Sequence, residues 1–70
     1  MKQITSTMTG NVWKILVSVG DEIADEQEVA ILESMKMEIP IEAEGGGKVK
    51  EIKISEGDFV NEGEVIMTIE

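Results

Sequence analysis

The candidate reactive residue of this chain is a lysine that lies between two methionines. The segment around it reads Glu33-Ser34-Met35-Lys36-Met37-Glu38. A lysine amine acts as a nucleophile once it is neutral, so Lys36 is the candidate reactive group. Flexible methionines flank it where turns usually contain Asn, Asp or Gly. The ordinary alternative is that the lysine is a solvated charge that keeps a turn soluble.

The rest of the composition excludes most enzyme mechanisms. The 70 residues contain no Cys, His or Tyr, and all six basic residues are lysines. Thiol and imidazole nucleophiles, the usual zinc ligands and disulfides are therefore absent. A chain this short buries only about 60% of the surface that its unfolded form exposes, which leaves little room for an enclosed active site. We expect no catalytic residue and no metal site, and we expect the acidic run at residues 21–28 to be solvated.

The charge and the apolar content limit the partners. Fifteen acidic and six basic side chains give a formal net charge of −9, which repels the phosphates of nucleic acid. Trp13 and Phe59 are the only aromatic side chains that could stack on bases. The sequence shows neither a signal peptide nor the roughly 20 apolar residues of a membrane span. We therefore expect a cytoplasmic monomer with no nucleic-acid and no membrane partner.

The apolar pattern predicts short strands. Apolar and polar residues alternate, which would place Trp13, Ile15, Val17 and Val19 on one face, and residues 49–54 alternate as well. Glycine-containing turns at residues 20–21, 45–47 and 57–58 separate the segments. Residues 21–30 fit a helix poorly, and we expect a turn that leads into a strand at residues 28–33. The sequence therefore predicts an all-β sandwich or barrel.

A shift of 37 residues aligns residues 10–33 with residues 47–70 without a gap. The identical pairs are Gly10/Gly47, Val12/Val49, Ile15/Ile52, Ser18/Ser55, Gly20/Gly57, Asp21/Asp58 and Glu33/Glu70. One repeat could not bury its apolar face alone, so two similar halves should pack about a pseudo-twofold axis. We expect a single domain over residues 1–70, with a protruding hairpin at residues 34–38 between the halves.

The expected hairpin places Lys36 at its turn. Met35 and Met37 are expected to hold the lysine upright, either with only one of them directed inward or with both straddling the turn and leaning back onto the barrel. Residues 45–47 are expected to form a bend rather than a linker. The other lysines lie away from turn centres, and three of them are expected on a soluble edge strand: Lys48, Lys50 and Lys53. We expect no modification of these lysines.

The segment from Glu33 to Glu38 resembles the attachment motif of biotinyl domains, in which the lysine between two methionines is covalently biotinylated. The motif lies midway between two similar β halves, and the resemblance covers the chain from about residue 7 to residue 70. It implies a flattened β-barrel, or barrel-sandwich hybrid, of two four-stranded antiparallel sheets with quasi-twofold symmetry. It also implies roles for the residues around Lys36 in recognition by the ligase, with Met35 and Met37 foremost and smaller contributions from Glu33, Ser34 and Glu38.

The resemblance implies a carrier rather than an enzyme. In this family a biotin protein ligase joins biotin to the lysine through a biotinyl-adenylate. Biotin carboxylase then carboxylates the biotin, and a carboxyltransferase passes the carboxyl group to an acceptor. These three enzymes are the expected partners, and biotin on Lys36 is the expected cofactor. A methionine start and a domain that fills the chain favour a stand-alone carrier.

Two other functions fit the sequence. The related lipoyl domains carry acyl groups on a lipoyl-lysine, and they usually have Asp-Lys-Ala where this chain has Met-Lys-Met. Lipoate on Lys36, attached by a lipoyl ligase, is one alternative, and a chain that accepts both groups is a variant of it. The other alternative is an unmodified β interaction module whose exposed methionines dock a protein.

Overall fold

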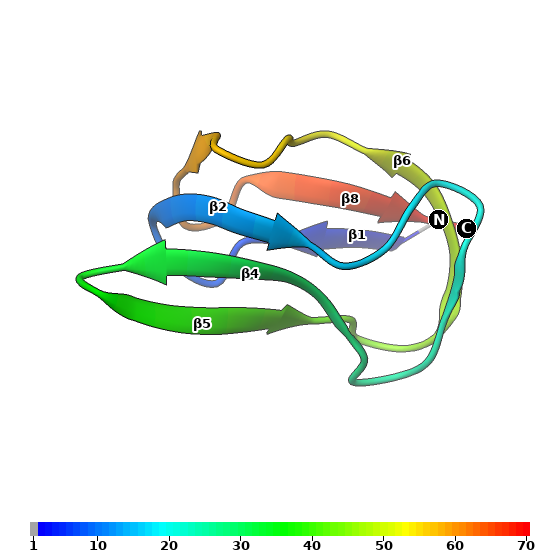
Figure 1. The fold of residues 1–70 in the computed structure, drawn as a ribbon. Coiled ribbons are helices and arrows are strands. Elements are labelled where there is room, and N and C mark those ends of the chain that lie inside the picture. The colour runs from blue at the N-terminus through cyan, green and yellow to red at the C-terminus, as the bar shows by residue number, and fades with distance from the viewer. Residues whose placement is uncertain (1) are drawn as a thin grey trace.

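The computed structural model describes residues 2–70, which form eight strands and no helix. The strands are β1 (Lys2–Thr5), β2 (Gly10–Ile15), β3 (Glu22–Ile23), β4 (Glu28–Ser34), β5 (Met37–Glu42), β6 (Gly47–Ile52), β7 (Phe59–Val60) and β8 (Val65–Ile69). They make two four-stranded sheets with the orders β1-β8-β6-β3 and β5-β4-β2-β7, and every strand pair is antiparallel (Figure 1). The two sheets form a flattened barrel, so the predicted fold class is confirmed. Residues 2–70 contain no helix with the length and apolarity needed to cross a membrane.

The two halves repeat the same topology. Strands β2, β3 and β4 begin at residues 10, 22 and 28, and β6, β7 and β8 begin 37 residues later at 47, 59 and 65. The same shift places β1 on β5, so each strand of one sheet has its counterpart at the same place in the other. The Gly20 amide donates to the Val49 carbonyl at 2.8 Å, and the Gly57 amide donates to the Val12 carbonyl at the same distance. Each half therefore hydrogen-bonds to the other in the same way.

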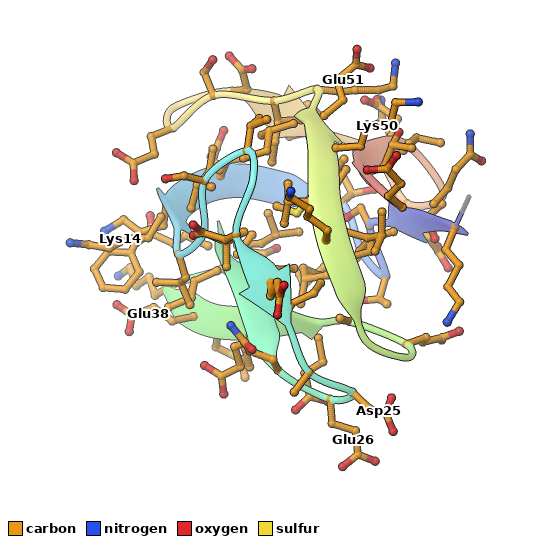
Figure 2. All side chains as sticks on the ribbon, turned by 90° about the vertical axis from the view of Figure 1, so that its right-hand side faces the viewer. Lys14, Asp25, Glu26, Glu38, Lys50 and Glu51 are labelled. Carbon is orange, nitrogen blue, oxygen red and sulfur yellow. The ribbon has the colours of Figure 1, made fainter. Side chains whose placement is uncertain are left out.

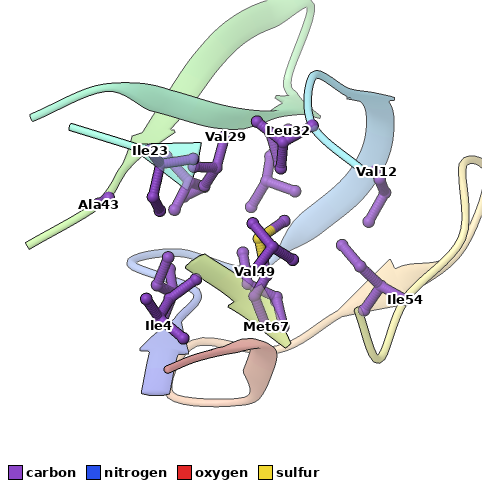
Figure 3. Close-up of a cluster of buried hydrophobic side chains, with 14 of the residues drawn as sticks. Ile4, Val12, Ile23, Val29, Leu32, Ala43, Val49, Ile54 and Met67 are labelled. Carbon is purple, nitrogen blue, oxygen red and sulfur yellow. The ribbon is translucent and has the colours of Figure 1, made fainter. Parts of the chain in front are cut away.

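The core lies between the sheets and draws on both of them. Figure 3 shows Val29 and Leu32 of one sheet facing Val49 and Met67 of the other. The buried apolar side chains are Ile4, Val12, Val17, Ile23, Val29, Ala30, Leu32, Ile41, Ala43, Val49, Ile54, Val60, Ile66, Met67 and Ile69. Most of them are β-branched residues, which suit the pleated inner face of a sheet.

Two details of the predicted strand pattern are wrong. The four residues from Trp13 to Val19 do not share one face, because Val17 is buried while Trp13 is 42% and Val19 is 62% exposed. The pairing of β2 with β4 shifts between Val12 and Lys14, and such a bulge breaks the alternation of side chains. The edge strand expected to carry lysines is also wrong, because β6 lies between β8 and β3.

The described ends of the chain meet at one end of the barrel. Strand β1 pairs with β8, and Lys2 lies opposite Ile69. Figure 1 shows the start of β1 and the end of β8 on the right of the molecule and the β4–β5 hairpin at the far left. The hairpin therefore points away from the termini.

Candidate functional site

A two-residue turn, Met35-Lys36, joins β4 to β5. Ser34 lies opposite Met37 in the last pair of the hairpin, and the next pairs continue without a shift as far as Ala30. The φ angles of Met35 and Lys36 are 50° and 66°. Positive φ at both central residues is the feature of a type I′ turn, whose twist matches that of the flanking strands. The structure thus places Lys36 at the tip of the hairpin.

The turn contains residues that suit it poorly. Type I′ turns favour Asn-Gly or Gly-Gly, because a side chain in the left-handed region costs about 1–2 kcal/mol per residue. Met35 and Lys36 both adopt this region. Asn or Gly in place of Met35 and Lys36 would make the turn more stable. Backbone strain from non-glycine residues with positive φ is found most often at functional sites.

The three residues of the tip are exposed. Met35 is 92% and Met37 is 61% exposed, and Lys36 is exposed as well. The alternative in which both methionines lean back onto the barrel does not occur, because both are exposed, and Met35 lies in a turn that extends past the last strand pair with no core beneath it. The thioether side chains are available to a partner instead.

The Lys36 side chain has no hydrogen bond or ion pair within residues 2–70. Other lysines are engaged: Lys53 Nζ lies 2.7 Å from Glu51 Oε1, and Lys14 Nζ lies 5.5 Å from the centroid of the Trp13 ring. Lys53 lowers the pKa of Glu51, because its ammonium donates a hydrogen bond to that carboxylate and places a positive charge beside it. The Lys36 amine is therefore held by nothing that a partner enzyme would have to displace.

The base of the hairpin is acidic. Glu33 and Glu38 lie directly opposite each other, both exposed, next to the pair of half-buried Ser34 with Met37. Like charges in this arrangement are destabilising. The start of β2 packs tightly behind them, because a Cβ on Gly10 would lie 2.8 Å from the Glu33 carbonyl oxygen.

The acidic run at residues 21–28 has a structural role. Asp21 Oδ2 accepts a hydrogen bond from the Ser18 amide at 2.8 Å, and Asp25 Oδ1 accepts one from the Gly45 amide at 2.6 Å. Across the part of the chain that the structure describes, no three potential metal ligands cluster. These carboxylates stabilise turns.

The hairpin and the barrel match a known family. A family model described as "Biotin-requiring enzyme", of the biotin/lipoyl type, matches residues 2–69. This chain belongs to the biotin/lipoyl family. The resemblance seen in the sequence is confirmed at the level of the family by this match.

Relatives in the biotin/lipoyl family differ in length. The chain is 59% identical over 66 residues to the biotin/lipoyl attachment protein of Bacillus subtilis, covering 94% of this chain and 90% of that protein. It is 45% identical over 62 residues to the biotin carboxyl carrier protein of Streptococcus mutans, covering 89% of this chain but 48% of that protein. The chain thus spans about half of the second relative.

A solved structure of a larger enzyme contains the same fold. The crystal structure of the urea carboxylase of Kluyveromyces lactis matches 97% of this chain with a TM-score of 0.91 and 35% identity. The match covers 6% of that enzyme, so it corresponds to one small part of a large protein.

The strain in the turn can be tested by substitution. We expect Met35→Asn to raise the free energy of unfolding by up to about 1 kcal/mol, because Asn tolerates the left-handed region better than Met. The measurement is the denaturant midpoint. Met37→Asn is the matched control, because Met37 lies in β5 and its φ is not positive, so no gain is expected. An equal gain in both variants would contradict the assignment of strain to the turn.

Proposed function

We propose that this chain is a biotin carrier and that Lys36 is the residue to which biotin is covalently attached. The observation that carries the proposal is the position of Lys36. It lies at the tip of a two-residue turn, without a side-chain partner in residues 2–70, between two exposed methionines. Acylation needs an amine that can enter the active site of another enzyme, and a turn at the end of the barrel provides one.

The Lys36 amine is the nucleophile of the proposed biotinylation. Once neutral, Nζ attacks the activated carboxyl carbon of biotinyl-adenylate in the ligase, a C–N amide bond forms, and AMP leaves. The proton released from nitrogen passes to a base of the ligase. The formal net charge then changes from 6 − 15 = −9 to 5 − 15 = −10. Attached biotin would supply a ureido nitrogen that accepts a carboxyl group and gives it up.

The names of the relatives support carboxylation as the context. Two of the matched proteins are a biotin carboxyl carrier protein and a urea carboxylase. We propose that this chain is a substrate of a biotin protein ligase and then a carrier for biotin carboxylase and a carboxyltransferase, and that it catalyses none of these steps. The exposed methionines beside Lys36, the half-buried Ser34 and the acidic pair Glu33 and Glu38 are the surface that the ligase would meet first.

The test is modification in vitro followed by mass spectrometry. The purified chain is incubated with a biotin protein ligase, ATP and biotin, and its intact mass and the peptide containing Lys36 are measured. We expect one biotinyl increment, located on Lys36. An unchanged mass, in a tube where an established acceptor domain is biotinylated, would contradict the proposal and favour an unmodified interaction module.

Lipoate is the second candidate, because the name of the B. subtilis relative includes both groups. A parallel reaction with a lipoyl ligase and lipoate measures the rate at which the chain is lipoylated. We expect slower lipoylation than biotinylation. Lipoylation in the absence of any biotinylation would replace the first candidate with the second.

A further inference from the structure

We propose that the outer face of the sheet β5-β4-β2-β7 is the surface on which a biotin protein ligase docks while it modifies Lys36. The inference rests on the function proposed above. Four side chains define this surface, which we call the apolar face: Trp13, Ile31, Pro40 and Phe59.

The strand register places these residues together. Phe59 lies opposite Asn11, Asn11 lies opposite Glu33, and Glu33 lies opposite Glu38, so one row crosses all four strands. In the next row Lys14 lies opposite Ile31, and Ile31 lies opposite Pro40. The apolar face therefore begins at the level of the acidic base of the hairpin and continues away from it.

The two aromatic residues are close on this face. Trp13 follows Asn11 by two residues on β2, and Asn11 is the partner of Phe59, so the two aromatic residues belong to neighbouring strands at nearly the same level. Phe59 is 60% and Trp13 is 42% exposed. Figure 2 shows Lys14, whose ammonium lies over the Trp13 ring, on the same side of the molecule as Glu38.

The internal repeat shows that the fold does not require apolar residues here. The 37-residue shift gives each member of the apolar face an equivalent on the other sheet, and all four equivalents are polar: Lys50 for Trp13, Thr68 for Ile31, Gln3 for Pro40 and Glu22 for Phe59. Lys50 lies on the opposite side of the molecule from Lys14 in Figure 2. At these four positions the outer face of one sheet is polar and that of the other is apolar, which indicates that the apolar positions have a partner.

The charges around the face favour a basic protein rather than a second copy. Glu33 and Glu38 lie in the same row as Phe59 and outnumber Lys14 of the next row, and the chain carries a formal net charge of −9, so two copies would repel each other. A partner with an apolar centre and a rim of Lys and Arg would complement this surface.

The position of the face favours the ligase among the proposed partners. The unmodified amine reaches only as far as one lysine side chain, so the enzyme that acylates it must come against the hairpin and the adjoining strands. An enzyme that acts later on the attached group can remain farther away, because the attached group lengthens the arm. The ligase is therefore the partner that has to cover the rows next to the turn.

The test replaces the two aromatic residues with the residues of the polar sheet. The double variant Trp13→Lys with Phe59→Glu leaves the net charge unchanged and places at each position a side chain that the fold already accepts in its other half. We expect the KM of the ligase for the carrier to rise about tenfold or more, with kcat within about twofold of the original. The matched control is Lys50→Gln with Glu22→Gln, which also leaves the net charge unchanged and should leave KM unchanged.

Circular dichroism and thermal unfolding establish that each variant is folded, and Phe59→Glu alone is measured in parallel as a milder change. An unchanged KM for the folded double variant would overturn the inference, as would an equal rise in the control. A rise only in the KM of biotin carboxylase for the biotinylated carrier would overturn the choice of the ligase. Concentration-dependent dimers of the original chain in sedimentation would assign the face to a second copy. If the original chain is not biotinylated at all, the proposed function has failed, and not this inference alone.

Discussion

Replacing Lys36 with arginine abolishes covalent attachment and leaves the barrel folded, if Lys36 is the acceptor. Arginine keeps the charge and tolerates the exposed turn as lysine does, but its guanidinium stays protonated and cannot be acylated under these conditions. We expect the biotinyl increment to fall below about 1% of the original level in the ligase reaction, because no amine that can be acylated remains at the turn. Intact mass and the unfolding midpoint are the two measurements.

The matched controls are Lys48→Arg and Lys53→Arg, which change the same residue type on and after β6. Both should be biotinylated at the original rate. Residual biotin on Lys36→Arg, mapped to another lysine, would show that the turn does not select the site.

Shortening Leu32 to alanine is expected to have the largest effect on stability. Leu32 is fully buried, and its strand β4 pairs with β2 on one side and β5 on the other. Removing a buried leucine side chain costs about 2–5 kcal/mol, depending on how far the cavity collapses. A domain of this size has a free energy of unfolding of roughly 4–10 kcal/mol, so the variant should lose a large part of its stability. Guanidinium unfolding monitored by circular dichroism measures the loss.

Val19→Ala is the control for the core variant. Val19 is 62% exposed, and its truncation should change the free energy of unfolding by less than about 0.5 kcal/mol. Because β4 carries one arm of the hairpin, biotinylation of Leu32→Ala should fall steeply above its lowered unfolding temperature. A midpoint equal to that of the original chain would show that Leu32 is not part of the cooperative core.

Much of the architecture could be predicted from the repeat. The paired Gly-Asp turns at residues 20–21 and 57–58 recur at the same interval as the apolar positions, and the structure joins the halves through hydrogen bonds of Gly20 and Gly57. A strand on each side of the Met-Lys-Met segment could also be predicted, because residues 29–32 and 39–41 are largely apolar and the short segment 33–38 separates them. These are local signals that need no knowledge of distant contacts.

The features that could not be predicted depend on partner strands. The shift between Val12 and Lys14 arises where β2 meets β4, and a pattern read along β2 alone gives no sign of it. Trp13 therefore looked like a member of one face with Ile15, although the bulge separates them. The same shift occurs between Val49 and Glu51, where β6 pairs with β8. The exposure of Met35 likewise follows from the length of the turn, which the residue types did not indicate.

The sequence signal for the apolar face lies in the pairs of the repeat that differ. Positions that are identical after the 37-residue shift support the existence of two halves. Positions that differ show where the two halves have different functions. Trp13 aligned with Lys50, and Phe59 aligned with Glu22, are such differences. Their meaning depended on knowing that all four positions point outward.

The meeting of the described chain ends opposite the hairpin has a mechanical consequence. The longest dimension of the molecule is 31 Å. If the chain is tethered at either terminus, to a neighbouring polypeptide or to a sensor surface, Lys36 faces outward and the barrel itself acts as a rigid spacer. A terminal affinity tag therefore leaves the hairpin accessible to soluble enzymes, whereas a tag inserted near β7 would obstruct the apolar face.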